Sequence, residues 1–577
     1  CLIKLLLDFF MIVLNFYKIS LKFILSIFFV IIFFSTANAK EVDKFENGKK
    51  IRDYFFGLLL LNENKHDKSY KYLKTLNGLE NSHRNFSNYF IYSLINSGKF
   101  NEAFNYSKKL ENKNLSIFES DLIIGIYYLK NKEFDLAQKY FQKISANKNN
   151  TVLNAFVANS LLNWASLDNL KMNEALLKIE SSSSKSLSLN RIQKVFLHCF
   201  YESKKTEIFF ENLTADKNLN FSRYNYFYAS YLSSIGKHEK EKKILKNAIG
   251  KYPRNLLLNQ YKLDLNNNKT VRDFNCQNLT HVIAEILYIT ANALSSQQIF
   301  SLSNFYLNIS KFLNDNFHSF DTLLAENFYN IDNLSQAKKI YSAISKKGVA
   351  YNWHAAKQNA NILIQEKKKD EALSLLKRAY EQLPDKNVYE KFDYAKFLKS
   401  NERFKESIRL YSEIIEKIDS KHPLYPKATD GRGVAYERTG EWDKAEKDLL
   451  SSLKASPDQA YVINYLAYSW IEQGVKIKKS LEMLQKANEL RSNDPYIIDS
   501  LGWAFFKLKR YNDSKKYLQS AVKLLPADPT VNDHYGDVLW MNGSKIQARY
   551  YWKYVLNLED TEKDLKENIK TKLISGL

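Results

Sequence analysis

The chain has 577 residues, of which 38 are Tyr, 37 are Phe, 16 are Gly and 8 are Pro. This content of large apolar side chains excludes an intrinsically disordered chain, and the scarcity of Gly and Pro excludes a protein with many tight turns. The net charge of +22 raises the question of a nucleic acid or another anionic partner. Basic residues are spread along the chain among Asp and Glu, which favours a solvated surface and no nucleic-acid partner.

The cysteines Cys1, Cys199 and Cys276 show none of the spacings that are typical of a metal site. We interpret Cys199 and Cys276 as two small buried apolar residues, with a disulfide between them as the alternative.

Residues 1–39 have the pattern of a secretory signal peptide, with residues 1–10 lying upstream of the true start. The apolar run from Phe23 to Phe34 is followed by small residues at 37–39, so we expect cleavage before Lys40 and export to the periplasm. The alternative is an uncleaved anchor in the inner membrane, facing the periplasm. Contact with a membrane is expected only in that case.

Residues 40–270 are predicted to form a degenerate array of helical pairs. Small or medium residues at Gly57, Ile91 and Gly125 are each 34 positions apart (91 − 57 and 125 − 91). Irregular stretches interrupt the pattern before the main boundary, which we place near residue 270.

Residues 271–558 repeat the pattern more regularly. The equivalent small residues, here called anchors, are Ala291, Ala325, Ala360, Ala395, Gly433, Ala467, Gly502 and Gly536. A second small or short residue follows about twelve positions later, as Ser514 follows Gly502. Such residues let two antiparallel helices approach closely, and Pro526 ends the second helix. Residues 559–577 are expected to form a capping helix and tail, because an end repeat needs a polar outer face.

This spacing resembles the tetratricopeptide repeat, TPR. The runs AYERTGEWDKAEKDL, YVINYLAYSWIEQG, DPYIIDSLGWAFFKL and DPTVNDHYGDVLW resemble a family of exported alphaproteobacterial TPR proteins. The resemblance is strong from about Ala284 to Leu558. It implies an all-α solenoid, a right-handed superhelix of helix-turn-helix repeats whose first helices line a concave face. It implies no known activity.

Polar residues recur three positions before successive anchors on the predicted first helices. They are Asp430, Asn464, Asp499 and Asp533, and the aromatic residues near them are Tyr468, Trp503, Phe506 and Trp540. Together these eight residues form the predicted partner-binding groove. The alternatives are local: the polar residues complement the first turn of each helix, and the aromatic residues pack between repeats.

No catalytic, cofactor-binding or metal-binding signature is found, and His534, in the run NDHYGD, is interpreted as structural. The sequence therefore predicts a non-enzymatic scaffold of the bacterial envelope that binds a protein or peptide and needs no cofactor. One alternative is a helical envelope enzyme or accessory protein resembling a lytic transglycosylase, although the residues after Leu558 are too few for a catalytic domain. The other is a binder of an anionic polymer through the basic surface.

Overall fold

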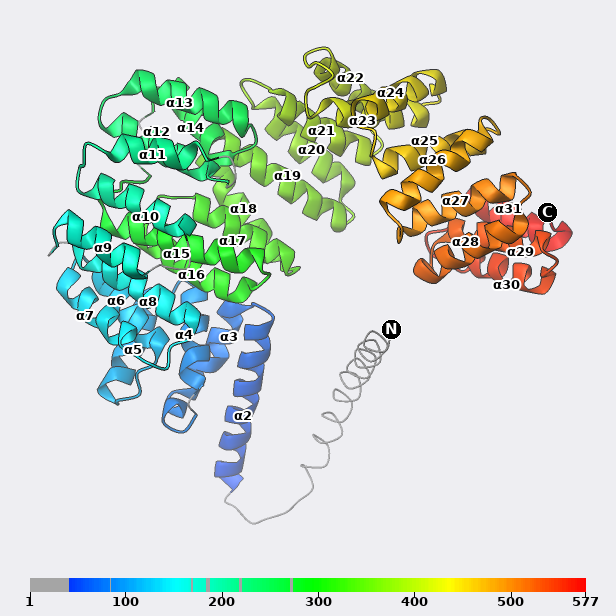
Figure 1. Ribbon diagram of the computed structural model, residues 1–577. Coiled ribbons are helices and arrows are strands. Elements are labelled where there is room, and N and C mark those ends of the chain that lie inside the picture. The colour runs from blue at the N-terminus through cyan, green and yellow to red at the C-terminus, as the bar shows by residue number, and fades with distance from the viewer. Residues whose placement is uncertain (1–40, 84, 168–169, 183–186, 217–219, 270–272) are drawn as a thin grey trace. The chain divides into compact units, whose positions relative to one another are not determined.

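The computed structural model describes most of the chain after residue 40, and every regular element in the described part is a helix (Figure 1). The described residues are 41–577 without 84, 168–169, 183–186, 217–219 and 270–272. The predicted signal peptide, residues 1–39, lies outside them. Within the described residues, no helix combines the length and the apolar character needed to cross a bilayer.

The helices of the first half are α2 (Glu41–Asn62), α3 (His66–Leu73), α4 (Phe86–Asn96), α5 (Phe100–Asn112), α6 (Phe118–Lys130), α7 (Phe134–Ser145), α8 (Val152–Ala165), α9 (Met172–Ser182), α10 (Leu187–Phe200), α11 (Thr206–Thr214), α12 (Ser222–Ser234), α13 (His238–Lys251) and α14 (Leu256–Asn266). Short 3-10 helices are η2 (Lys74–Leu76), η3 (Leu79–Asn81) and, further on, η5 (Ser345–Lys347).

The helices of the second half are α15 (Leu279–Ser296), α16 (Phe300–Leu313), α17 (Ser319–Asn330), α18 (Leu334–Ile344), α19 (Val349–Gln365), α20 (Lys369–Glu381), α21 (Val388–Ser400), α22 (Phe404–Ile415), α23 (Tyr425–Arg438), α24 (Trp442–Ala455), α25 (Ala460–Glu472), α26 (Ile477–Leu490), α27 (Pro495–Lys507), α28 (Tyr511–Leu524), α29 (Pro529–Met541), α30 (Lys545–Leu556) and α31 (Lys563–Ser575).

Each predicted anchor lies on the first helix of a pair, and at the glycine anchors a large residue of the second helix lies opposite. A Cβ atom added to Gly502 would come within 2.7 Å of Leu518, and one added to Gly536 within 2.5 Å of Trp552. The anchor is therefore small because the partner helix leaves no room for a side chain. Helical pairs in register over α15–α30 confirm the predicted all-α TPR solenoid.

The turn inside each pair has a fixed backbone shape. The residue seven positions after the anchor has positive φ in one repeat after another. Gly440, Gly474 and Gly543 take this position after Gly433, Ala467 and Gly536, with φ of 80°, 71° and 79°. Elsewhere a larger residue takes it, as Lys509 does with φ of 58°. The left-handed residue ends the first helix and starts the turn to the second.

The chain folds into two compact units that alternate along the sequence. Unit 1 contains residues 1–219 and 272–333, and unit 2 contains residues 220–271 and 334–577. The predicted boundary near residue 270 concerned repeat regularity and stays a prediction, since residues 270–272 lie outside the described part.

In unit 1, helix α16 packs against α4 and α6, which are first helices of the N-terminal pairs. Tyr92 of α4 stacks on Phe305 of α16 with ring centroids 4.5 Å apart, and Phe100 stacks on Phe312 at 4.1 Å. The chain therefore covers the first helices of its own N-terminal array.

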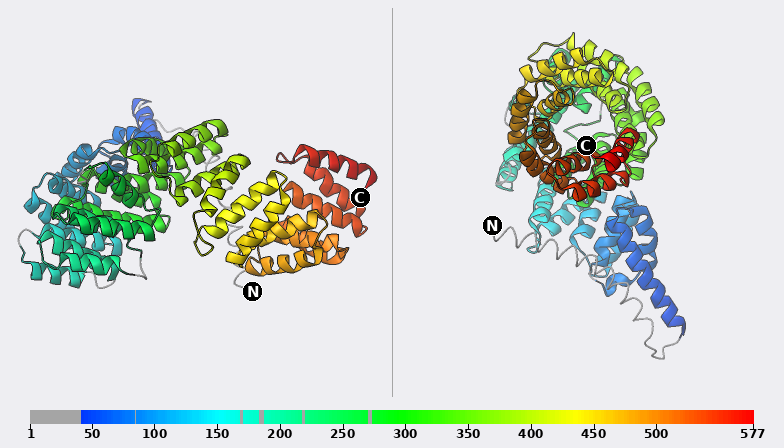
Figure 2. Two further views of the ribbon diagram at one scale, coloured as in Figure 1. Left: turned by 90° about the horizontal axis from the view of Figure 1, so that it is seen from above. Right: turned by 90° about the vertical axis from the view of Figure 1, so that its right-hand side faces the viewer.

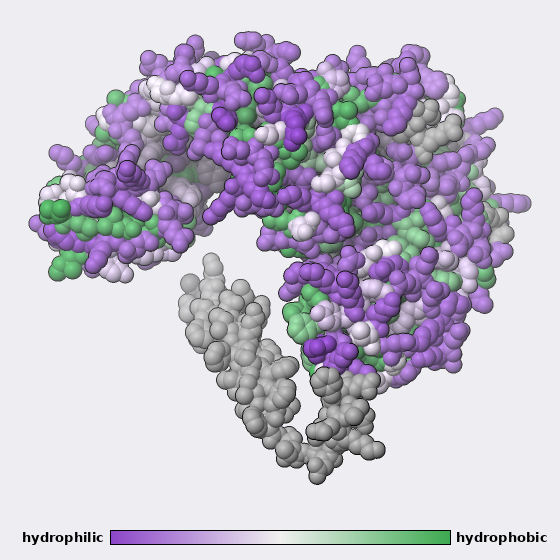
Figure 3. Space-filling view, turned by 180° about the vertical axis from the view of Figure 1, so that it is seen from behind, coloured by the Kyte–Doolittle hydropathy of each residue, from purple (hydrophilic) through white to green (hydrophobic). Residues whose placement is uncertain are grey.

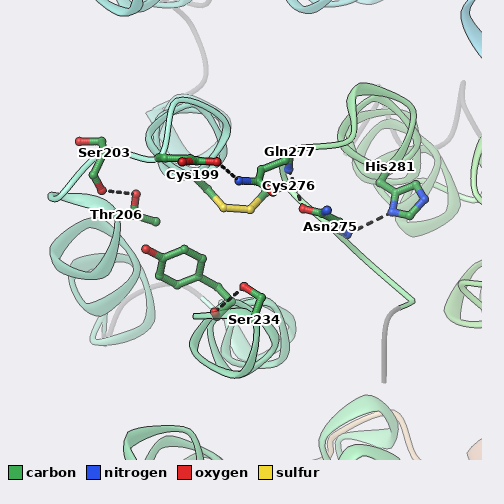
Figure 4. The surroundings of a disulfide bond; sticks show 10 residues. Cys199, Ser203, Thr206, Ser234, Asn275, Cys276, Gln277 and His281 are labelled. Atoms are coloured by element: carbon green, nitrogen blue, oxygen red, sulfur yellow. Dashed lines mark hydrogen bonds between the residues drawn. A yellow bond between two sulfur atoms is a disulfide. The ribbon is translucent and has the colours of Figure 1, made fainter. Parts of the chain in front are cut away.

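A disulfide joins Cys199, near the end of α10, to Cys276, in the segment before α15 (Figure 4). Beside it, Gln277 donates a hydrogen bond to Glu202 at 2.6 Å. The favoured interpretation of these cysteines as unpaired apolar residues was wrong. They lie 77 residues apart, and only the folding of α10 near α15 within unit 1 brings their Cα atoms to 5.9 Å.

In unit 2, the pairs from α19 to α30 follow one another around a curve (Figure 2, right). First helices contact the next first helix, as α21 contacts α23, α25 contacts α27 and α27 contacts α29. The first helices α25, α27 and α29 therefore lie side by side, and most of the predicted groove residues lie on them.

The face of the molecule seen from behind is mostly polar. Figure 3 shows hydrophilic residues over most of the face seen from behind, with hydrophobic residues in scattered groups. The most exposed large apolar side chains include Ile546 and Tyr550 of α30 and Ile574 of α31, which are 88%, 69% and 84% exposed.

Candidate partner-binding groove

Helix α14 packs on α19, at the start of the row of first helices in unit 2. Gln260 of α14 accepts a hydrogen bond from the backbone N–H of Ala350 at 3.0 Å. Arg254, just before α14, pairs with Asp393 of α21 at 2.5 Å, and its guanidinium lies 5.4 Å from the Tyr389 ring centre. A cavity of about 50 Å³ remains between these elements, enough for one or two water molecules. This end of the row is therefore occupied.

Helix α31 covers the other end of the row, at α29. Lys572 Nζ lies 2.7 Å from Asp533 Oδ1 and 2.8 Å from both carboxylate oxygens of Asp537. The ammonium is buried with both acids. Gly576 lies against Trp540, since a Cβ atom added to Gly576 would come within 2.0 Å of the indole. The tail that was predicted to cap the array thus holds two of the predicted groove residues.

Between these ends, side chains of three repeats meet around His534. His534 Nδ1 lies 2.9 Å from Asp499 Oδ2, and the imidazole stacks on Trp503 with centroids 3.9 Å apart and planes 11° apart. Tyr468 lies at the edge of the cluster, 6.4 Å from the imidazole. Trp503 in turn stacks on Phe506 at 4.6 Å and donates its indole N–H to Glu472 at 2.6 Å. The cluster forms a rigid floor that joins α25, α27 and α29.

Nearby acidic groups shift the pKa values of His534 and Asp537 in and beside this floor. Burial disfavours the charged imidazole, yet Asp499, with smaller contributions from Asp533 and Asp537, raises the pKa of His534 above its usual value. Burial, together with Asp533, raises the pKa of Asp537 to about 6, against the opposing effect of Lys572. His534 is therefore a buried hydrogen-bond partner of Asp499, and its interpretation as a structural residue stays a prediction.

Asp430 and Asn464 lie outside the His534 cluster. Burial raises the pKa of Asp430, although the ammonium of Lys399 favours its charged form. Asn464 is half-buried, and its Oδ1 atom is buried without a hydrogen-bond partner among the described residues.

The eight predicted groove residues therefore have three different environments. Asp499 and Trp503 are buried in the floor, with Tyr468 and Phe506 half-buried beside them. Asp533 and Trp540 lie beneath α31. Asp430 and Asn464 lie on α23 and α25. The structure brings the first four together and separates the rest.

The alternative explanation of the polar row as first-turn residues was wrong. The N-caps of α27 and α29 are Asp494 and Asp528, whose carboxylates accept hydrogen bonds from backbone N–H groups at 3.1 Å and 3.0 Å. Asp499 and Asp533 lie one turn further along and make side-chain contacts to the following repeat or to α31. Packing between repeats, the second alternative, describes Trp503 well because its ring contacts His534 of the next first helix.

Several accessible residues were missed. Tyr461 of α25 and Tyr496 of α27 are 54% and 55% exposed and occupy equivalent positions, six before their anchors. Glu472 and Lys507 are also exposed and equivalent, five after the same anchors. Their recurrence at a fixed distance from the anchor would have identified them, had exposed residues been sought at every repeat position. Lys572 has no such signal, because it comes from outside the repeats.

The described residues contain no group of three or more His, Cys, Asp or Glu side chains arranged to hold a metal ion. The row of first helices carries amide, carboxylate, ammonium and phenol groups.

Comparison with known proteins agrees with this architecture. Residues 325–561 match the family described as "Tetratricopeptide repeat". The "TPR repeat-containing protein PA4667" of Pseudomonas aeruginosa is 27% identical over 181 residues, which is 31% of this chain and 30% of that protein. The chain thus matches less than a third of the length of this relative.

Among solved structures, "MamA RS-1 ArsTM double mutant" is 16% identical, covering 31% of this chain and 97% of that chain with a TM-score of 0.27. "YrrB: a TPR protein with an unusual peptide-binding site" is also 16% identical, covering 34% of this chain and 97% of that chain with a TM-score of 0.27. The anchors and the turns agree with the family match: residues 325–561 match the tetratricopeptide repeat family and fold as successive helical pairs.

Proposed function

We propose that this protein is a non-enzymatic scaffold of the bacterial envelope that binds a protein or peptide partner on α23, α25 and α27. The observation that carries the proposal is the repetition of exposed side chains on α25 and α27. Tyr461 and Tyr496 form one equivalent pair, and Glu472 and Lys507 form another. A row of equivalent groups on a stiff frame suits a chain that lies along several repeats.

Several other first helices are already covered by helices of the same chain, which favours α23, α25 and α27 as the binding surface. Helix α16 covers the first helices α4 and α6 in unit 1, α14 covers α19 in unit 2, and α31 covers α29. The middle first helices keep exposed tyrosines, which provide large contact area at a small cost in conformational entropy.

The floor beneath these groups supports binding by preorganisation. The Asp499–His534 hydrogen bond and the Trp503–His534 stack fix the spacing of α27 and α29. A partner then meets a surface that has little conformational freedom left to lose.

We place this scaffold in the periplasm. Disulfides persist in oxidising compartments such as the periplasm and are rare in the cytosol, so the Cys199–Cys276 bond supports export. The signal-like pattern of residues 1–39 supports it independently.

The test is capture of partners from an envelope extract by three forms of the chain. The first is the wild type, and the second carries Tyr461→Ala with Tyr496→Ala. The control is Tyr550→Ala, because Tyr550 is as exposed (69%) but lies on a second helix, α30. We expect the double variant to lose at least about tenfold in affinity for a captured partner, since interfacial tyrosines often carry about 1–2 kcal/mol each. Equal capture by the wild type and the double variant would show that α25 and α27 are not the binding surface.

A further inference from the structure

Lys572 of α31 lies between Asp533 and Asp537 at the α29 end of the row of first helices, as the lysine of a bound ligand would. Its ammonium contacts both carboxylates, Asp533 and Asp537, and lies 5.9 Å from the centre of the Trp552 ring. Four of its oxygen contacts are between 2.7 and 2.9 Å. Two buried carboxylates need a cation, because leaving them unpaired in the interior is strongly unfavourable. The site is therefore shaped and charged for an ammonium or guanidinium group.

Helix α31 has a narrow apolar face. Ile569 is its only fully buried apolar side chain among the residues described, with Leu565 and Leu573 half-buried against the same core, while Ile574 and Leu577 are 84% and 53% exposed. The ion pairs of Lys572 add a buried charged contact to this apolar face. Another helix that offers a similar apolar face and a lysine at the same place could therefore take its position.

The cluster also contains more acid than base. Asp533 and Asp537 share the ammonium of Lys572, and Asp499 pairs with the imidazole of His534. Two carboxylates therefore face a single ammonium at the α31 end of the cluster. This surplus favours a ligand that is at least as cationic as Lys572.

Displacement of α31 would also enlarge the proposed groove. Asp533 and Trp540 lie on the first helix α29, next in the row after α27, and α31 covers both through Lys572 and Gly576. Without α31, α29 would present the same combination of carboxylate and aromatic ring as its neighbour.

We propose that α31 is an internal competitor for the groove, and that the partner carries an amphipathic helix whose lysine replaces Lys572 between Asp533 and Asp537. The helix needs an apolar residue three positions before that lysine, as Ile569 precedes Lys572. This inference rests on the proposed function, since it names the chemistry of the partner for the end of the same groove.

The test uses the full chain and a fluorescent peptide that copies residues 563–577. The variants are Lys572→Gln and Lys572→Glu, which weaken the internal helix and leave the two acids in place. The matched control is Lys570→Gln, because Lys570 lies on the same helix, is exposed and pairs only with Glu567 in the part of the chain described. Binding is followed by fluorescence anisotropy, and a second peptide carries Gln in place of the lysine that copies Lys572.

We expect both Lys572 variants to bind the peptide at least about tenfold more tightly than the wild type, because an attached competitor acts at an effective concentration in the millimolar range. Lys570→Gln should behave as the wild type, and the Gln peptide should bind weakly throughout. Adding Asp533→Asn and Asp537→Asn to Lys572→Gln should abolish the gain.

Equal affinity of the wild type and the folded Lys572→Gln chain would overturn the inference, as would binding that survives loss of both acids. Lys572→Gln removes the positive charge without placing a third carboxylate beside the two acids, so it decides the outcome if Lys572→Glu disturbs the last repeat. If partner capture depends on Tyr461 and Tyr496 while the peptide result is negative, the groove stands and the competition fails. If neither result is obtained, both proposals fail.

Discussion

Asp537 illustrates how one residue can link the stability of the last repeat to pH. Its carboxylate accepts the indole N–H of Trp552 at 2.9 Å and contacts Lys572. Burial and Asp533 raise its pKa from 3.8 to about 6. The folded protein therefore binds this proton more tightly than the unfolded chain does. The resulting contribution to stability is complete below about pH 4 and is lost as the pH rises through about 6. The raised pKa of His534 acts in the same direction.

Asp537→Asn should remove part of this pH dependence. Between about pH 7.5 and about pH 5, the free energy of unfolding of the wild type should rise relative to the variant by about 1 kcal/mol, roughly half of what the whole shift would give below about pH 4. Urea unfolding followed by tryptophan fluorescence measures it. Asp513→Asn, at an exposed site on α28, is the control and should follow the wild type. Parallel pH profiles for wild type and Asp537→Asn would contradict the assignment.

The sequence predicted which polar residues recur but not which of them are satisfied internally. Asp499 and Asp533 were identified by their distance from the anchors, and that distance is the same whether or not a partner exists. Their actual partners, His534 and Lys572, lie 35 and 39 residues further along the chain. Only the stacking of repeats and the folding back of α31 bring these groups together, and periodicity contains no information about either.

At the scale of the element, the helical pairs were largely predictable. The anchors, the small residues after them and the prolines are local signals, and the contact of Gly502 with Leu518 shows their physical origin. The attachment of α14 and α31 was not predictable to the same degree, since each covers the row through a few long-range contacts such as Gln260 with Ala350.

The turn seven residues after each anchor gives a test of this local reasoning. Lys509 has φ of 58°, a conformation that costs a non-glycine residue about 1–2 kcal/mol. Lys509→Gly should therefore raise the free energy of unfolding, by about 0.5–1 kcal/mol after the entropy cost of glycine. Lys516→Gly, at an exposed position inside α28, should lower it by about 1 kcal/mol. Urea unfolding followed by circular dichroism compares the two. A loss of stability in Lys509→Gly would show that the turn does not need a left-handed residue.

At the scale of the whole molecule, the chain leaves unit 1 after residue 219 and returns to it at residue 272. The Cys199–Cys276 disulfide lies in unit 1 and closes the loop that contains this excursion (Figure 4). No spacing rule connects two cysteines 77 residues apart, which is why the sequence left the pairing open and the favoured interpretation failed. The bond joins both ends of a long insertion, so it contributes to the stability of the whole fold and not of a single helix.

Reduction of this disulfide should destabilise unit 1. Closing a loop between residues 77 apart restricts the unfolded chain and is worth about 4–5 kcal/mol in the chain-entropy description. We therefore expect dithiothreitol to lower the midpoint of thermal unfolding and to speed amide hydrogen exchange in α10 and α15. The variant Cys199→Ser with Cys276→Ser should show the lower midpoint without reductant and no further change with it. Protein from the periplasm should resist alkylation by iodoacetamide until it is reduced. Alkylation of both cysteines in unreduced periplasmic protein would contradict the bond and remove the disulfide as support for export.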